Sequence, residues 1–129
     1  MFTLIHGANS SSCAWFPQVA HFSVKYFVIT MDLRGHGCSE FEDVKFLDIE
    51  KYFASDLIAV LDNWEVSATA LVCQSLGGAV GSRCALTDPD RITCLVMGNT
   101  YAGFLQDGDA PDFWSCGFEQ EQVLKVQSS

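Results

Sequence analysis

The chain has 129 residues, of which 49% are hydrophobic and 18% charged, and its formal charge is −9. This composition indicates one folded domain with a moderate core. The negative charge argues against nucleic acid or an anionic membrane as a partner. No apolar run reaches the ~20 residues of a membrane span, and the first residues lack the basic flank of a signal peptide.

The cysteines are too scattered to indicate a metal site or a disulfide framework. None of the six forms a C-x-x-C pair, and no histidine lies at ligand spacing to them. We therefore expect no metal. Free thiols without a signal peptide favour a reducing compartment, so the predicted location is cytoplasmic.

The first half of the chain alternates between apolar runs and helical patterns. Residues 2–5 form a continuous apolar run, typical of a strand buried on both faces of a parallel sheet. Ser12 is the expected cap of a helix that carries apolar residues through Phe22. Residues 26–31 are rich in β-branched and aromatic side chains and predict the second strand.

A glycine-punctuated loop at 32–39 precedes the clearest helix, which is predicted to begin at Asp48. The expected apolar stripe of this helix consists of Ile49, Tyr52, Phe53, Leu57, Val60, Leu61 and Trp64. Glu50 is expected to lie outside this stripe. Residues 69–73 predict a third strand, followed by a helix through Leu86 and a fourth strand at 92–97.

Beyond Gly98 the pattern changes. Residues 101–117 have no firm period, and 118–126 predict the beginning of another helix. We therefore divide the chain into a core at 1–100 and the start of a lid-like insertion or tail at 101–129. Strands that alternate with helices predict an α/β fold with a doubly wound parallel sheet of about four strands and flanking helices.

The stretch Leu71-Val72-Cys73-Gln74-Ser75-Leu76-Gly77-Gly78-Ala79 is the most informative one. An apolar run that stops at a serine and continues through small residues is typical of a strand that turns sharply into a helix. The positions two before and two after such a serine must be small, because the turn is strained. Gly77 meets this demand fully and Cys73 approximately.

Three motifs in this order resemble the α/β-hydrolase fold family. His6-Gly7-Ala8 follows the first strand, Asp32-Leu33-Arg34-Gly35-His36-Gly37-Cys38-Ser39 the second, and Cys-Gln-Ser-Leu-Gly-Gly the third. The resemblance covers roughly residues 2–100, the N-terminal part of the fold only. Within the family the chain is similar to enol-lactone and small-ester hydrolases.

The resemblance implies a serine hydrolase acting on carboxylic esters, lactones or related small acyl substrates. Ser75 matches the nucleophile, and the backbone N–H groups of Ala8 and Leu76 match the two oxyanion donors. Gln74 is expected to face the substrate. This chemistry requires neither a metal nor an organic cofactor.

The remaining polar and aromatic residues are interpreted as structural. His6 and His36 are expected to shape loops, and Asp32 to accept hydrogen bonds from nearby backbone donors. His21 is expected to be solvated. Trp15 and Trp64 are expected in or near the core.

A working site of this family needs an acid and then a histidine after the serine. No histidine follows Ser75, and Asp107, Asp109 and Asp112 lie in the lid-like segment without an assigned role. The chain alone is therefore expected to be inactive. Two functions stay open: a serine hydrolase whose other parts lie outside this chain, and a non-catalytic remnant that binds a ligand or partner.

The resemblance also implies a sheet cut short on both sides. In the family's strand count the order across the sheet is 4-3-5-6. In this chain that order corresponds to the second predicted strand, then the first, the third and the fourth. Both edges would be unpaired, and self-association through them is expected. The chain is thus expected to be a fragment or truncated product of a larger hydrolase.

Overall fold

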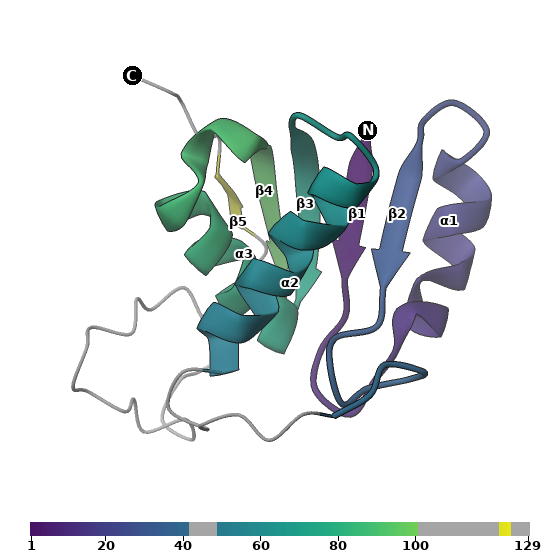
Figure 1. Ribbon diagram of the computed structural model, residues 1–129. Coiled ribbons are helices and arrows are strands. Elements are labelled where there is room, and N and C mark those ends of the chain that lie inside the picture. The colour runs from purple at the N-terminus through teal and green to yellow at the C-terminus, as the bar shows by residue number, and fades with distance from the viewer. Residues whose placement is uncertain (42–48, 101–121, 125–129) are drawn as a thin grey trace.

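Four parallel strands make up most of the sheet (Figure 1): β1 (Phe2–Ile5), β2 (Val28–Met31), β3 (Thr69–Gln74) and β4 (Ile92–Gly98). The computed structural model describes residues 1–41, 49–100 and 122–124. The strand order is β2-β1-β3-β4-β5, and each of the four pairs in parallel with its neighbour. The predicted fold class and the order of these four strands are confirmed.

The fifth strand departs from the expectation. β5 (Gln122–Leu124) pairs antiparallel with β4, so the helix predicted over 118–126 is wrong at these residues. The outer edge of β4 is therefore paired, whereas β2 has no outer partner among the described residues. The rest of 101–129, with its predicted lid-like character, lies outside the described residues.

Helices cover the sheet on both faces. Phe2 and Ile5 differ by three positions on β1, so their side chains point to opposite faces. The Phe2 ring lies 5.3 Å from the ring of Phe22 at the end of α1 (Phe16–Phe22). Ile5 instead packs with residues of α2 (Ile49–Asn63) and α3 (Leu76–Thr87). Hence α1 covers one face, and α2, which crosses in front of the strands in Figure 1, covers the other with α3.

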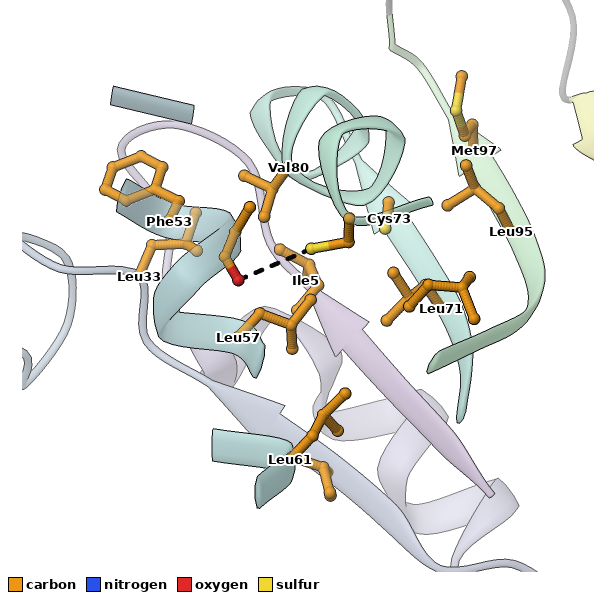
Figure 2. Close-up of a cluster of buried hydrophobic side chains, with 14 of the residues drawn as sticks. Ile5, Leu33, Phe53, Leu57, Leu61, Leu71, Cys73, Val80, Leu95 and Met97 are labelled. Carbon is orange, nitrogen blue, oxygen red and sulfur yellow. Dashed lines mark hydrogen bonds between the residues drawn. The ribbon is translucent and has the colours of Figure 1, made fainter. Parts of the chain in front are cut away.

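The main core lies between the sheet, α2 and α3 (Figure 2). Leucines at the spacing of α2, such as Leu57 and Leu61, are fully buried against strand residues such as Leu71. The buried apolar members are Ile5, Ile29, Leu33, Phe53, Ala54, Leu57, Leu61, Val66, Leu71, Cys73, Val80, Cys84, Ile92, Leu95 and Met97. Burying each large aliphatic side chain stabilises the fold by about 1.5–3 kcal/mol before the cost of ordering it.

The buried face of α2 is rotated relative to the predicted stripe. Trp64 is 61% exposed and Tyr52 38% exposed, so the placement of Trp64 in the core is wrong. Glu50 is buried instead, because its carboxylate accepts a hydrogen bond from Arg83 of α3 at 3.1 Å. A charged partner on the neighbouring helix allows a carboxylate to replace an apolar residue at this position.

The segment before α1 also differs from the expectation. A short 3-10 helix, η1 (Ser12–Trp15), precedes α1, and no side chain caps either helix among the described residues. Ser12 contributes its backbone N–H to Asp32 at 2.6 Å, so its predicted capping role is wrong. A second 3-10 turn, η3 (Pro89–Arg91), follows α3. None of the described helices is long and apolar enough to cross a membrane.

Candidate active site

Ser75 occupies a strained turn between β3 and α3. Its backbone angles are φ 52° and ψ −119°, in a region that non-glycine residues rarely adopt. Such a conformation costs about 1–3 kcal/mol and persists only where the surroundings enforce it. The predicted sharp strand-to-helix turn with Ser75 at its apex is therefore confirmed.

Glycines allow the turn to pack directly on the loop after β1. A Cβ atom on Gly77 would lie 2.5 Å from the carbonyl oxygen of Ile5, closer than any real contact. A Cβ on Gly7 would lie 2.9 Å from Cβ of Ser75 and 2.7 Å from Oε1 of Gln74. Both glycines are thus required by close approach, and Gln74 lies against the His6-Gly7-Ala8 loop.

Cys73 replaces the first small residue that the resemblance calls for, and the structure shows how it fits. Its side chain is buried beside Gly81, where a Cβ would lie 2.7 Å from the Cys73 Sγ. The missing side chain at Gly81 therefore leaves the room that Cys73 occupies. Burial raises the pKa of the Cys73 thiol, so the thiol stays neutral and acts as an apolar group.

Three hydrogen bonds hold the backbone of Ser75. Its N–H donates to the carbonyl of Gly98 at 3.1 Å. Its carbonyl oxygen accepts from the N–H of Gly78 at 2.8 Å and from Oγ1 of Thr100 at 2.5 Å. Gly98 at the end of β4 and Thr100 just after it therefore hold the turn at Ser75. The sequence did not predict this contact, although the segment Gly98-Asn99-Thr100 follows the predicted fourth strand.

His6 is fully buried and both of its ring nitrogens are engaged. Nε2 accepts the N–H of Leu33 at 3.1 Å, which assigns the ring proton to Nδ1, and Nδ1 donates to the carbonyl of Gly7 at 2.7 Å. The ring therefore joins the loop after β1 to the loop after β2. It is structural, as expected, and has no free nitrogen with which to accept a proton from Ser75.

The other two histidines lie in the loop after β2 and on the surface of α1. Nδ1 of His36 lies 3.2 Å from the carbonyl oxygen of Arg34, and the ring lies 5.2 Å from that of His6. The ring of His36 also meets Phe53 edge-on. His21 is exposed on α1, as expected.

Asp32 organises the loop after β2, as expected. Its carboxylate accepts the backbone N–H of Cys38 at 2.9 Å and of Ser12 at 2.6 Å. Ser39 donates its hydroxyl to the Asp32 carbonyl at 2.8 Å. The N–H groups of Cys38 and Ser12 hold the pKa of the Asp32 carboxyl below its ordinary value.

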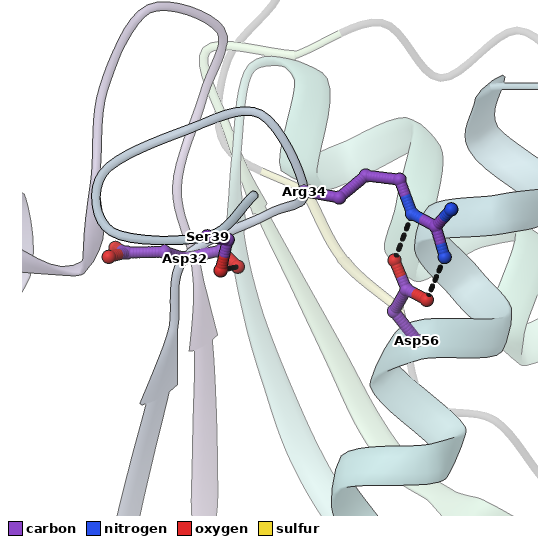
Figure 3. Close-up of polar contacts among 4 residues, drawn as sticks. All are labelled: Asp32, Arg34, Ser39 and Asp56. Carbon is purple, nitrogen blue, oxygen red and sulfur yellow. Dashed lines mark hydrogen bonds and ion pairs between the residues drawn. The ribbon is translucent and has the colours of Figure 1, made fainter. Parts of the chain in front are cut away.

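Arg34, farther along the same loop, ties it to α2. Its guanidinium makes two hydrogen bonds to Asp56, with Nε 2.7 Å from one carboxylate oxygen and the second nitrogen 2.5 Å from the other (Figure 3). The guanidinium also lies 5.6 Å from the centre of the Tyr52 ring. A two-pronged pair of this kind fixes orientation better than a single contact does.

The predicted site residues thus meet at the carboxyl ends of the strands. Ser75 and Leu76 follow β3, and the exposed Ala8 follows β1 directly after Gly7. Among the described residues, the N–H groups of Ala8 and Leu76 donate to no backbone carbonyl. Leu76 begins α3, where the helix dipole favours negative charge. No group of three or more potential metal ligands exists in the described part of the chain.

Comparison with known proteins identifies the family. A sequence profile described as "alpha/beta hydrolase fold" matches residues 2–117. The chain belongs to the α/β-hydrolase fold family. Two relatives in this family are 3-oxoadipate enol-lactonase 2 of Acinetobacter baylyi and the pimeloyl-[acyl-carrier protein] methyl ester esterase of Aliivibrio salmonicida.

The enol-lactonase is 36% identical over 74% of this chain and 34% of its own length. The esterase is 33% identical over 72% of this chain and 33% of its own length. A solved α/β-hydrolase structure, a hydrolase from Pseudomonas aeruginosa, is 30% identical, with a TM-score of 0.74 over 80% of this chain and 38% of that one. The chain therefore spans well under half the length of each of these proteins.

Proposed function

We propose that the protein is a serine hydrolase of carboxylic esters, lactones or related small acyl substrates, with Ser75 as the nucleophile. The observation that carries this proposal is the strained φ of 52° at a serine directly before the N-terminus of α3. Strain of this kind is retained where it presents a reactive group. The lactonase and esterase relatives favour the same chemical class.

In the proposed reaction, Oγ of Ser75 attacks the acyl carbonyl carbon and loses its proton to a base. A C–O bond forms, and the carbonyl π electrons move onto the oxygen, which becomes an oxyanion. The N–H groups of Leu76 and Ala8 stabilise that charge, each by about 3–4 kcal/mol. When the oxyanion collapses, the leaving alkoxide departs with a proton, and water then releases the acid from Ser75. Gln74, beside Gly7, contacts the bound substrate.

The base is the part that these 129 residues do not supply. His6 is buried with both nitrogens engaged, and no histidine follows Ser75. We therefore propose that the histidine, and the acid that orients it, come from residues outside this sequence. Without them, residual catalysis over water falls to about 10³–10⁴-fold.

The missing base also favours a second candidate, a non-catalytic domain that binds a small ligand or a partner. The two candidate functions predict different reactivities of the Ser75 hydroxyl. A nucleophile placed in a prepared oxyanion site reacts with an electrophile faster than other serines do. A remnant without that site leaves Ser75 no more reactive than an exposed serine.

The test is stoichiometric labelling by an alkyl fluorophosphonate, located by mass spectrometry. The Ser75 oxygen bonds to phosphorus, fluoride leaves, and the hydroxyl proton passes to buffer. We expect Ser75 to be labelled faster than Ser55, an exposed serine on α2. The substitution Ser55→Ala should leave the labelling rate of Ser75 unchanged. Equal labelling of Ser75 and Ser55 contradicts the hydrolase proposal and favours the remnant.

We also propose a reducing, cytoplasmic location. Cys13 and Cys38 are exposed free thiols, and Cys73, Cys84 and Cys94 are free as well. Unpaired exposed thiols persist in reducing compartments and are oxidised elsewhere. Fractionation of cells that express the protein tests this location.

A further inference from the structure

We propose that Thr100 is a positioning residue that aims and polarises the Leu76 N–H through the Ser75 carbonyl. The inference rests on the proposed function, in which that N–H is an oxyanion donor. Oγ1 of Thr100 donates to the Ser75 carbonyl oxygen at 2.5 Å. The Ser75 carbonyl and the Leu76 N–H belong to one planar peptide group, so holding the oxygen fixes the direction of the N–H.

The contact also acts electronically. A donor to the carbonyl oxygen draws electron density from the peptide nitrogen, which makes the N–H at the other end of the group a stronger donor. Such cooperative strengthening is roughly 10–30% per bond. The hydrogen bonds thus form a chain that runs from the Thr100 hydroxyl through the Ser75–Leu76 peptide to the substrate oxygen.

Two neighbouring features allow the Thr100 hydroxyl to reach the Ser75 carbonyl oxygen. Asn99 has φ 48°, in the left-handed region, and forms a bend between the end of β4 and Thr100. A Cβ on Gly78 would lie 2.1 Å from Oγ1 of Thr100, so the hydroxyl occupies the space that this glycine leaves open. The Gly78 N–H donates to the same carbonyl oxygen at 2.8 Å and completes its coordination.

The decisive comparison is Thr100→Ser against Thr100→Ala. Both variants lack the threonine methyl, and only the first retains the hydroxyl, so their difference isolates the hydrogen bond. With the fluorophosphonate, whose phosphoryl oxygen takes the place of the substrate oxygen, we expect Thr100→Ala to label Ser75 about three- to tenfold more slowly than Thr100→Ser. A role in stability alone leaves the labelling rates of the two folded variants equal.

The second readout is the backbone amide of Leu76, followed by NMR. Thr100→Ala removes the hydroxyl and is expected to shift the Leu76 amide resonances. Thr100→Ser should leave these resonances close to those of the wild type, and the Leu71 amide in β3 should stay unchanged in both variants.

The labelling rate and the amide resonances together distinguish the positioning role of Thr100 from the proposed hydrolase function. If Ser75 labels no faster than Ser55, the hydrolase proposal fails, and the Leu76 amide still decides whether Thr100 acts on the peptide. Equal Leu76 resonances in Thr100→Ser and Thr100→Ala overturn the positioning role, as do equal labelling rates at a reactive Ser75.

Discussion

Cys73 and Gly81 share one space near the strained turn at Ser75: the Cys73 Sγ lies 2.7 Å from where a Cβ of Gly81 would be. The same added carbon would lie 2.8 Å from Cδ1 of Leu95, so it would meet a side chain on each of two strands. The thiol and the absent side chain are therefore complementary. The first prediction concerns this pair.

Gly81→Ala is expected to lower the free energy of unfolding by about 1–2 kcal/mol. Overpacking costs about 1–3 kcal/mol, whereas alanine regains up to about 1 kcal/mol of helix propensity. Chemical denaturation measures the loss. Gly98→Ala is the matched control, because its Cβ would meet nothing closer than 3.9 Å. Adding Cys73→Ala to Gly81→Ala should recover part of the stability; strictly additive effects of the two substitutions would contradict the shared space.

His6→Ala is expected to lower the free energy of unfolding by about 2–4 kcal/mol. The substitution leaves the buried Leu33 N–H without its acceptor and removes the donor to the Gly7 carbonyl. Urea denaturation measures this loss. His21→Ala, at an exposed histidine on α1, should change stability little. Equal effects of the two substitutions would rule out the bridging role of His6.

Asp32→Asn is expected to reduce stability at neutral pH. The folded-state pKa of Asp32 is lowered from an ordinary value of 3.8, so its ionised carboxylate stabilises the fold above that value. This contribution is lost as the pH falls below about 4 toward the folded-state pKa. Denaturation midpoints of wild type and Asp32→Asn should therefore differ at pH 7 and approach each other as the pH falls below about 4 toward the folded-state pKa. Asp90→Asn, at an exposed residue of η3, serves as the control and should show no such convergence.

The thiols are expected to react with iodoacetamide in two groups. Cys13 and Cys38 are exposed and should be alkylated in the native protein. Burial raises the pKa of Cys84 to about 12 and raises that of Cys73 as well, so neither supplies thiolate at pH 8. Peptide mapping should find Cys73 and Cys84 modified only after unfolding. Their alkylation at the same rate as Cys38 would show that the core opens readily.

The chain alone is expected to show no measurable turnover of p-nitrophenyl acetate above the buffer rate. It contains a serine in the strained turn, but no histidine follows that serine and both ring nitrogens of the buried His6 are engaged. The assay compares wild type with Ser75→Ala, which should be indistinguishable. Rapid hydrolysis that disappears in Ser75→Ala would mean that another group in this chain is the base.

Continuous apolar runs made the four parallel strands predictable, and the turn at Ser75 was predictable because only small residues permit it. The features that the sequence did not predict depend on contacts between segments that are distant in the chain. Trp64 continues the apolar spacing of α2 in the sequence, but the helix ends at Asn63; Trp64 is exposed, and its ring centre lies 6.2 Å from that of Phe27. Glu50 could be buried only because Arg83 lies on the adjoining helix, thirty-three positions away.

The hydrogen bond from Thr100 to Ser75 was hidden for the same reason. Its two partners are twenty-five positions apart, and it depends on the unusual backbone of Asn99 and on the space left by Gly78. Neither condition leaves a periodic signal. The segment 118–126 shows the opposite failure, since β5 forms by pairing with β4 although its local pattern favours a helix.

The contacts that enforce the backbone of Ser75 have a consequence for biosynthesis. The close packing of Gly77 on Ile5, the bond to Gly98 and the bond from Thr100 all come from residues numbered 100 or lower. Nascent chains fold from the N-terminus as they leave the ribosome. A chain that has emerged as far as Thr100 thus carries every partner that these contacts require, and the strained turn can be assembled before anything translated later reaches it.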